Sequence, residues 1–128
     1  MKGIMKVLLL MAVVTASGCA VHMTDVKSDM AQGQGVTQIV NCDTATAHDT
    51  AKSVLQGNKH FDAVQDDGTA LFAVGNRTVF GVQIKKIDAT HTEIVAVSKR
   101  KNPTLITTDM SEDEFFKAFN ALLENSKK

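Results

Sequence analysis

Hydrophobic residues are spaced differently in successive parts of the chain, and this spacing separates strands from helices. Residues 36–41 are rich in β-branched side chains, which predicts a short strand. Over residues 47–55, small and apolar side chains recur every three or four positions, so they share one stripe of a helix. Asp43 or Thr44 can cap this helix by accepting a hydrogen bond from a free backbone N–H group. Gly57 is placed to end it in a left-handed conformation.

The middle of the chain alternates between short apolar strands and polar turns. The predicted strands span 61–65, 70–74, 77–88 and 92–99, with turns at Asp66-Asp67-Gly68, Gly75-Asn76 and 88–91. The longest strand places Phe80 and Val82 on one face. Its other face carries Val79, Gln83 and Lys85, which indicates solvent along part of that side. Because tight turns join only antiparallel neighbours, these strands should form a meander.

The last predicted helix has both a start signal and a long apolar stripe. Ser111 and Glu114 have the spacing of a capping box, in which each side chain accepts a hydrogen bond from the other residue's backbone N–H group. Met110 and Phe115 are spaced as the hydrophobic staple that accompanies such a cap. The stripe that this helix is expected to bury consists of Phe115, Phe116, Phe119, Leu122 and Leu123.

Together these elements predict a single α+β domain over residues 36–126. Their order is β-α-β-β-β-α, and we allow one further short strand at Leu105–Thr108, before the last helix. The antiparallel sheet should have three to five strands, and both helices should pack on it because each carries one apolar stripe. The strand order stays open, since the first strand can pair with either the edge or the centre of the meander.

The beginning of the chain has the pattern of a secretory signal that ends at a cysteine. Lys2 and Lys6 form a basic start, residues 7–14 form a short apolar core, and small residues lead to Cys19. The core is too short to cross a bilayer, which needs roughly 20 residues. Residues 16–19 (Ala-Ser-Gly-Cys) resemble the lipobox of bacterial lipoproteins.

This resemblance implies how the mature protein is held. It implies that a diacylglyceryl group is attached to the Cys19 sulfur, that residues 1–18 are cleaved off as a signal peptide, and that the new amine is acylated. Several acyl chains anchor firmly because each buried CH₂ group contributes about 0.8 kcal/mol. In lipoproteins of this kind, Ala20 implies sorting to the inner leaflet of the outer membrane. An ordinary signal peptide, with Cys19 as a thiol or in a disulfide, is the alternative.

Residues 19–35 show no sustained hydrophobic period. The Gly33 and Gly35 spacing suits a flexible linker. We therefore expect these residues to be the lipidated N-terminus and a flexible tether between the lipid and the domain. A segment that becomes ordered on contact with a partner is the alternative.

Composition and charge narrow the function mainly by exclusion. Removing residues 1–18 leaves 110 residues, with 12 basic and 14 acidic side chains, which is enough for one small domain. The resulting net charge of −2 argues against general nucleic-acid binding, which needs a basic surface.

The element order over residues 36–126 is similar to that of small uncharacterised lipoproteins of Gram-negative bacteria, in which a helix and a three-strand meander precede a terminal helix. That resemblance supplies no catalytic motif.

Few side chains are candidates for catalysis, metal binding or contact with a partner. Lys99, Arg100 and Lys101 form the largest run of one charge and could contact anionic headgroups or an acidic partner. Cys42 and His48 could act as a nucleophile and its base. No oxyanion-hole motif or third orienting residue accompanies them, and a metal site would need more ligands. The sequence therefore predicts no catalytic residue, no metal site and no cofactor.

These patterns predict a non-catalytic lipoprotein of the cell envelope. We expect a periplasm-facing domain that is held at the outer membrane by Cys19 and that binds or assembles with an envelope protein. The alternative is a small-ligand-binding lipoprotein with a pocket between the sheet and the C-terminal helix.

Overall fold

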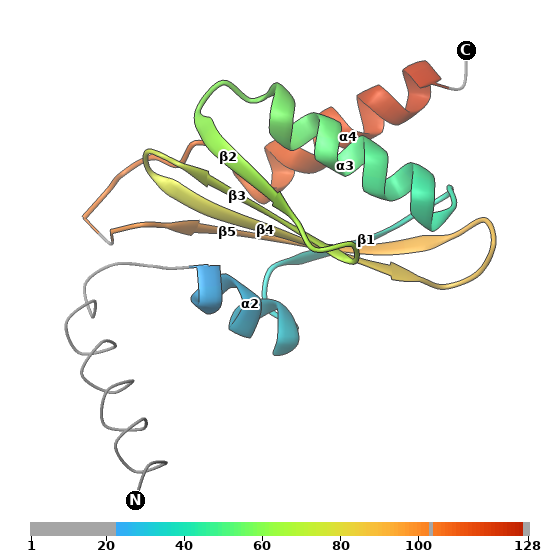
Figure 1. Ribbon diagram of the computed structural model, residues 1–128, viewed down its shortest axis with the longest axis horizontal. Helices are drawn as coiled ribbons and strands as arrows, with labels where there is room; N and C mark the ends of the chain where they lie inside the picture. Colours follow the sequence, from blue (N-terminus) through green and yellow to red (C-terminus); the bar gives the residue numbers. More distant parts are fainter. Residues whose placement is uncertain (1–22, 103, 127–128) are drawn as a thin grey trace, which may run out of the picture.

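The computed structural model describes residues 23–102 and 104–126, which form three layers with the sheet in the middle (Figure 1). The elements are α2 (Met23–Ala31), β1 (Val36–Val40), α3 (Thr44–Gly57), β2 (Phe61–Asp66), β3 (Ala70–Gly75), β4 (Thr78–Lys86), β5 (Thr92–Arg100) and α4 (Glu112–Ser126). The α+β class is confirmed. Among the described residues, no helix combines the length and apolar character needed to cross a membrane.

The sheet has five strands in the order β1-β5-β4-β3-β2, and every neighbouring pair is antiparallel. β2 to β5 form the predicted meander, since each pairs with the next strand along the chain. β1 pairs with β5, and Val36 lies opposite Ala96 while Val40 lies opposite Thr92. The first strand therefore lies at an edge of the sheet, beside the last strand of the meander.

α3 and α4 lie together on one face of the sheet and enclose the main core with it (Figure 1). Phe80 of β4 and Phe115 and Phe119 of α4 are fully buried. The ring centroids of Phe80 and Phe115 are 5.3 Å apart, and those of Phe115 and Phe119 are 6.0 Å apart. Burial of a phenylalanine contributes about 1.5–3 kcal/mol, so these rings hold α4 to the sheet. Leu122 departs from the predicted stripe, because it remains 40% exposed on the outer side.

Both predicted helix starts are confirmed by their hydrogen bonds. Asp43 is the cap of α3, and its Oδ1 accepts a hydrogen bond of 2.7 Å from the Thr46 backbone N–H group. At α4, the Ser111 N–H group donates to Glu114 Oε1 and the Glu114 N–H group donates to Ser111 Oγ, both at 3.2 Å. These bonds satisfy backbone donors that the helices themselves leave free.

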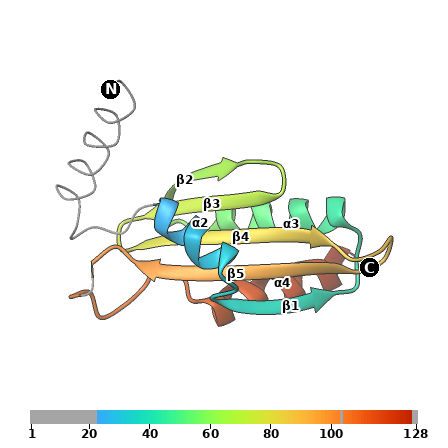
Figure 2. The same cartoon turned by 90° about the horizontal axis from the view of Figure 1, so that it is seen from below.

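The opposite face of the sheet is covered by a helix that the sequence pattern did not predict. Figure 2 shows α2 lying across the strands on this side. Val26 and Met30, one helical turn apart, are buried against the sheet. The prediction of a flexible tether is therefore wrong for residues 23–31. A nine-residue helix with two buried apolar residues has little stability of its own, and packing on the sheet stabilises it.

The two glycines between α2 and β1 form a defined turn rather than a flexible linker. Gly33 and Gly35 have φ angles of 77° and 96°, which residues other than glycine rarely adopt. A Cβ atom on Gly35 would also collide with the backbone oxygen of Ala96 in β5. Gly35 therefore lets the chain turn from α2 into β1 directly against the neighbouring strand.

Two smaller predictions are corrected by the structure. Residues 105–108 form a loop rather than a short strand, because side-chain bonds from Arg77 and Arg100 hold the segment instead of a strand ladder. Gly57 is the last residue of α3 but has no positive φ angle. The helix ends instead at the extended residue Asn58, whose N–H group bonds to the Leu55 carbonyl.

We predict that substitution of Gly81 destabilises the domain through α2. A Cβ atom on Gly81 of β4 would collide with Val26 Cγ1 of α2. Gly81→Ala should therefore lower the free energy of unfolding by about 1–3 kcal/mol, as is typical of overpacking. Urea denaturation measures this change.

Gly57→Ala is the matched control, because a Cβ atom on Gly57 would meet no neighbouring atom and the φ angle there is ordinary. It should leave the unfolding free energy unchanged or raise it by up to about 1 kcal/mol. Equal effects of the two substitutions would contradict the packing of α2 on β4.

Candidate functional site

The predicted lipidation site lies outside the described residues. Cys19, the signal peptide over residues 1–18 and the first four residues of the predicted tether all precede Met23, where the description begins. The remaining predicted site residues, Lys99, Arg100 and Lys101, lie where β5 ends and the chain turns toward α4.

The basic run is built into the fold more closely than a solvent-exposed patch would be. Lys99 Nζ lies 2.7 Å from Asp29 Oδ2, so this lysine forms an ion pair that ties β5 to α2. Arg100 Nη1 donates a hydrogen bond of 2.6 Å to the Leu105 carbonyl oxygen. The Lys101 backbone N–H group donates to the Arg77 carbonyl. The three residues therefore lie at one end of the sheet, where Arg100 is exposed and Lys99 and Lys101 are partly buried.

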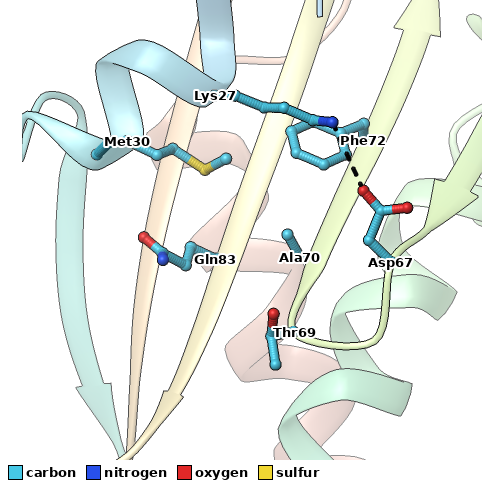
Figure 3. Close-up of a pocket in the computed structure, with 8 residues that line it drawn as sticks. Lys27, Met30, Asp67, Thr69, Ala70, Phe72 and Gln83 are labelled. Atoms are coloured by element: carbon cyan, nitrogen blue, oxygen red, sulfur yellow. Dashed lines mark ion pairs between the residues drawn. The ribbon is translucent and has the colours of Figure 1, made fainter. Parts of the chain in front are cut away.

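α2 covers a second apolar cluster on its side of the sheet. Val26 and Met30 pack on side chains from three strands, and these are Phe72, Val79, Val95 and Val97. Val79 was predicted to face solvent, but it is buried in this cluster. Lys27 Nζ lies 5.0 Å from the centre of the Phe72 ring and 3.8 Å from Asp67 Oδ2. The ammonium group thus joins α2 to the turn after β2 (Figure 3).

A pocket of about 260 Å³ lies at the edge of α2, over β3 and β4 (Figure 3). It is lined by Lys27, Met30, Ala31, Asp67, Thr69, Ala70, Phe72 and Gln83. Its lining combines the Lys27–Asp67 ion pair with apolar side chains such as Met30 and Phe72, so the pocket is partly charged and partly apolar. A space of this size fits a small amphipathic group rather than a drug-sized ligand.

The expected ligand pocket between the sheet and the C-terminal helix is filled by side chains. That interface is occupied by Phe80, Phe115 and Phe119, which are all fully buried. A hollow of about 500 Å³ lies instead on the outside, between α3 and α4, beside Leu122. The position that the sequence suggested for a ligand therefore serves as core.

His48 is held by two carboxylates. Its Nε2 lies 2.9 Å from Asp66 Oδ1, and its Nδ1 lies 3.3 Å from Asp49 Oδ1. The hydrogen bond to Asp66 raises the pKa of His48, and it also holds the pKa of Asp66 well below its usual range. Lys52 Nζ adds a contact of 3.1 Å to Asp66 Oδ2. This network ties α3 to the end of β2.

The remaining candidate groups are Cys42 and the turn at residues 66–68. Cys42 lies half-buried against the main core, and its backbone carbonyl accepts a hydrogen bond from Thr92 Oγ1. The predicted turn at residues 66–68 is confirmed, since Gly68 has a φ angle of 88° and its N–H group donates to Asp66 Oδ1. Within residues 23–102 and 104–126, no group of three or more histidine, cysteine or acidic residues could hold a metal ion.

Among the described residues, the most exposed large apolar side chain is one that the sequence pattern did not reveal. Ile106 is 93% exposed in the loop before α4. Leu105 and Ile106, followed by two threonines, suggested a strand, and a strand would have half-buried them. The nearby basic residues were the available signal, because an apolar pair beside Lys99–Lys101 also fits a contact surface.

We predict a pH dependence of stability that comes from His48. Because its pKa is raised above the ordinary value of 6.5, the folded protein binds this proton more tightly than the unfolded chain does. The stabilisation is fully present below about pH 6.5 and is lost as the pH rises through the folded pKa. His48→Gln should remove this part of the pH dependence in urea denaturation at about pH 5.5 and 8.5.

The control is His60→Gln, since His60 is an exposed histidine at the start of β2, away from Asp66. This variant should keep the wild-type pH dependence, and Asp66→Asn should lose it. A His48→Gln variant with an unchanged difference between the two pH values would contradict the assignment.

Comparison with known proteins gives no relative from which a site could be transferred. No protein-family model matches the chain, and no curated protein matches it. Function therefore has to be inferred from the chain's own residues and from their geometry.

Proposed function

We propose that this chain is a non-catalytic lipoprotein of the bacterial cell envelope, anchored through Cys19 to the inner leaflet of the outer membrane. Its α+β domain faces the periplasm and binds or assembles with another envelope protein. The basis for the anchor is the pattern of residues 1–19, in which a basic start and a short apolar core lead to small residues and a cysteine.

The proposal is supported mainly by the short stretch of chain between Cys19 and the packed domain. α2 begins at Met23, so only residues 20–22 separate it from Cys19. Four residue steps at about 3.6 Å each span at most roughly 14 Å. A lipid on Cys19 therefore holds the domain close to the leaflet, and a partner must meet it there.

An edge of the sheet provides a surface for that partner. β1 is an edge strand, and edge strands offer free backbone N–H and C=O groups to another chain. Ile39 of β1 is 61% exposed and lies on the α2 side, beyond the reach of the main core. An exposed β-branched residue on an edge strand favours pairing with a strand of a partner.

We predict that a photo-reactive amino acid in place of Ile39 cross-links a specific envelope protein in cells. The wild-type mature protein should carry acyl chains by mass spectrometry and should float with outer membranes. In Cys19→Ala, both the lipid and the specific cross-link should be lost, because the domain is no longer held at the leaflet. Leu122 on α4 is the matched control, since it is also an exposed apolar residue but lies on the helix side.

Three outcomes separate the parts of the proposal. An unmodified Cys19 in the wild-type mature protein would overturn the anchor. A lipidated protein without a specific adduct at either position would overturn the partner. An adduct from position 122 alone would overturn the assignment of the interface to β1.

A further inference from the structure

The loop that carries Ile106 lies at the basic end of the sheet. This Ile106 loop, residues 104–109, follows β5 and leads to α4. Its 93% exposed isoleucine is the most exposed large apolar side chain among the described residues. The surrounding cations are Arg77, at the turn between β3 and β4, and Arg100 and Lys101, at the end of β5.

The Ile106 loop is braced on both sides by these arginines. Arg77 Nη1 donates a hydrogen bond of 3.1 Å to Thr107 Oγ1, and Arg100 Nη1 donates one of 2.6 Å to the Leu105 carbonyl oxygen. The Asp109 carboxylate accepts hydrogen bonds from the Arg77 and Thr78 backbone N–H groups at 2.8 and 3.0 Å. The loop is therefore fixed to the β3–β4 hairpin, and it presents Ile106 outward.

The charges at this end remain available to an anion. Both arginine hydrogen bonds go to uncharged oxygens, so they do not neutralise the guanidinium groups. The nearby opposing charges are the Asp109 carboxylate, which accepts from two backbone donors, and the Glu112 carboxylate, which accepts from the Ser98 backbone N–H group at 3.2 Å. Lys99 is different, because its ion pair with Asp29 neutralises it. Arg77, Arg100 and Lys101 thus give the surface around Ile106 a positive balance.

α2 begins toward the same end of the sheet. Both Figure 1 and Figure 2 place the start of α2 toward the end of the sheet from which the segment between β5 and α4 leaves. The Lys99–Asp29 ion pair joins the last turn of α2 to the strand that ends there. Cys19 precedes α2 by only four residues, so a lipid on it would bring the leaflet close to Ile106.

We propose that the Ile106 loop is a second membrane contact, and this rests on the proposed anchoring through Cys19. Ile106 enters the interfacial region of the leaflet, while Arg77 and Arg100 meet the phosphates of anionic headgroups. Guanidinium groups bind phosphate oxygens with paired N–H donors, and basic residues are attracted to an anionic membrane surface. The loop thereby fixes how the domain is oriented on the membrane.

A similar surface at the other end of the sheet supplies the matched control. Ile87, in the turn between β4 and β5, is 48% exposed and follows Lys85 and Lys86. A nine-residue strand at about 3.3 Å per residue separates the two ends by roughly 30 Å. Only the Ile106 end is close to the start of α2 (Figure 2). The two ends carry similar residues, so a difference between positions 87 and 106 reports the orientation of the domain rather than the residue type.

Tryptophan fluorescence tests this contact, because the chain contains no tryptophan. Ile106→Trp and Ile87→Trp are each made in the full chain, and the lipidated proteins are reconstituted into vesicles of phosphatidylethanolamine and phosphatidylglycerol. Brominated acyl chains in these vesicles quench a tryptophan that enters the bilayer. We expect a blue-shifted and strongly quenched emission at position 106 and an unshifted, unquenched emission at position 87.

The outcomes distinguish this contact from the anchor itself. Protein that floats with the vesicles but shows no quenching at position 106 would overturn the loop contact and leave the anchor intact. Equal quenching at both positions would also overturn it, since the domain would then have no fixed orientation. Replacement of phosphatidylglycerol by phosphatidylcholine should reduce the quenching at position 106, and an unchanged signal would overturn the role of the arginines. Protein that is not lipidated and does not float would instead overturn the proposed function.

Discussion

α2 packs on the sheet where Val26 lies over Gly81 of β4. The proposed position of the domain at the membrane depends on this contact. Gly81 leaves the space that the Val26 side chain fills, and Phe72 and Val97 complete its surroundings. The Lys99–Asp29 ion pair and the contact of Lys27 with Phe72 add to it from either side. Without this packing, residues 23–31 would lengthen the proposed tether, and the domain would be free to move away from the proposed anchor.

Because α2 is packed on the sheet, the fold itself determines how the domain would be oriented relative to a lipid on Cys19. Because α2 starts four residues after Cys19, the end of the sheet where α2 begins must lie nearest to an attached lipid. The Ile106 loop is at that end, whereas the turn with Ile87 is at the other. The β1 edge with Ile39 runs along the side of the sheet and stays accessible to the proposed partner. One short helix thus relates the proposed anchor, the proposed membrane contact and the proposed binding edge.

The parts that could be predicted from sequence are those with strong local signals. The capping box at Ser111 and Glu114 and the turn at Gly68 act within a few residues, so their patterns identify them. α2 has no such signal, since its two buried residues become meaningful only against a sheet formed by distant strands. The exposure of Ile106 was also hidden, because side chains of Arg77 and Arg100 hold its loop where a strand was expected. The anchor itself remains a prediction from the pattern ending at Cys19.

Hydrogen exchange of the α2 amides tests whether α2 stays packed on the sheet. The measurement uses the lipidated protein in vesicles and compares the backbone N–H groups within Met23–Ala31 that donate inside the helix with those of β4, the strand beneath it. Docking of α2 predicts slow exchange in both, because α2 can open only by exposing Val26 and Met30. Exchange of the α2 amides at the rate of an unstructured peptide, with β4 still protected, would contradict the claim and return these residues to the role of a flexible tether.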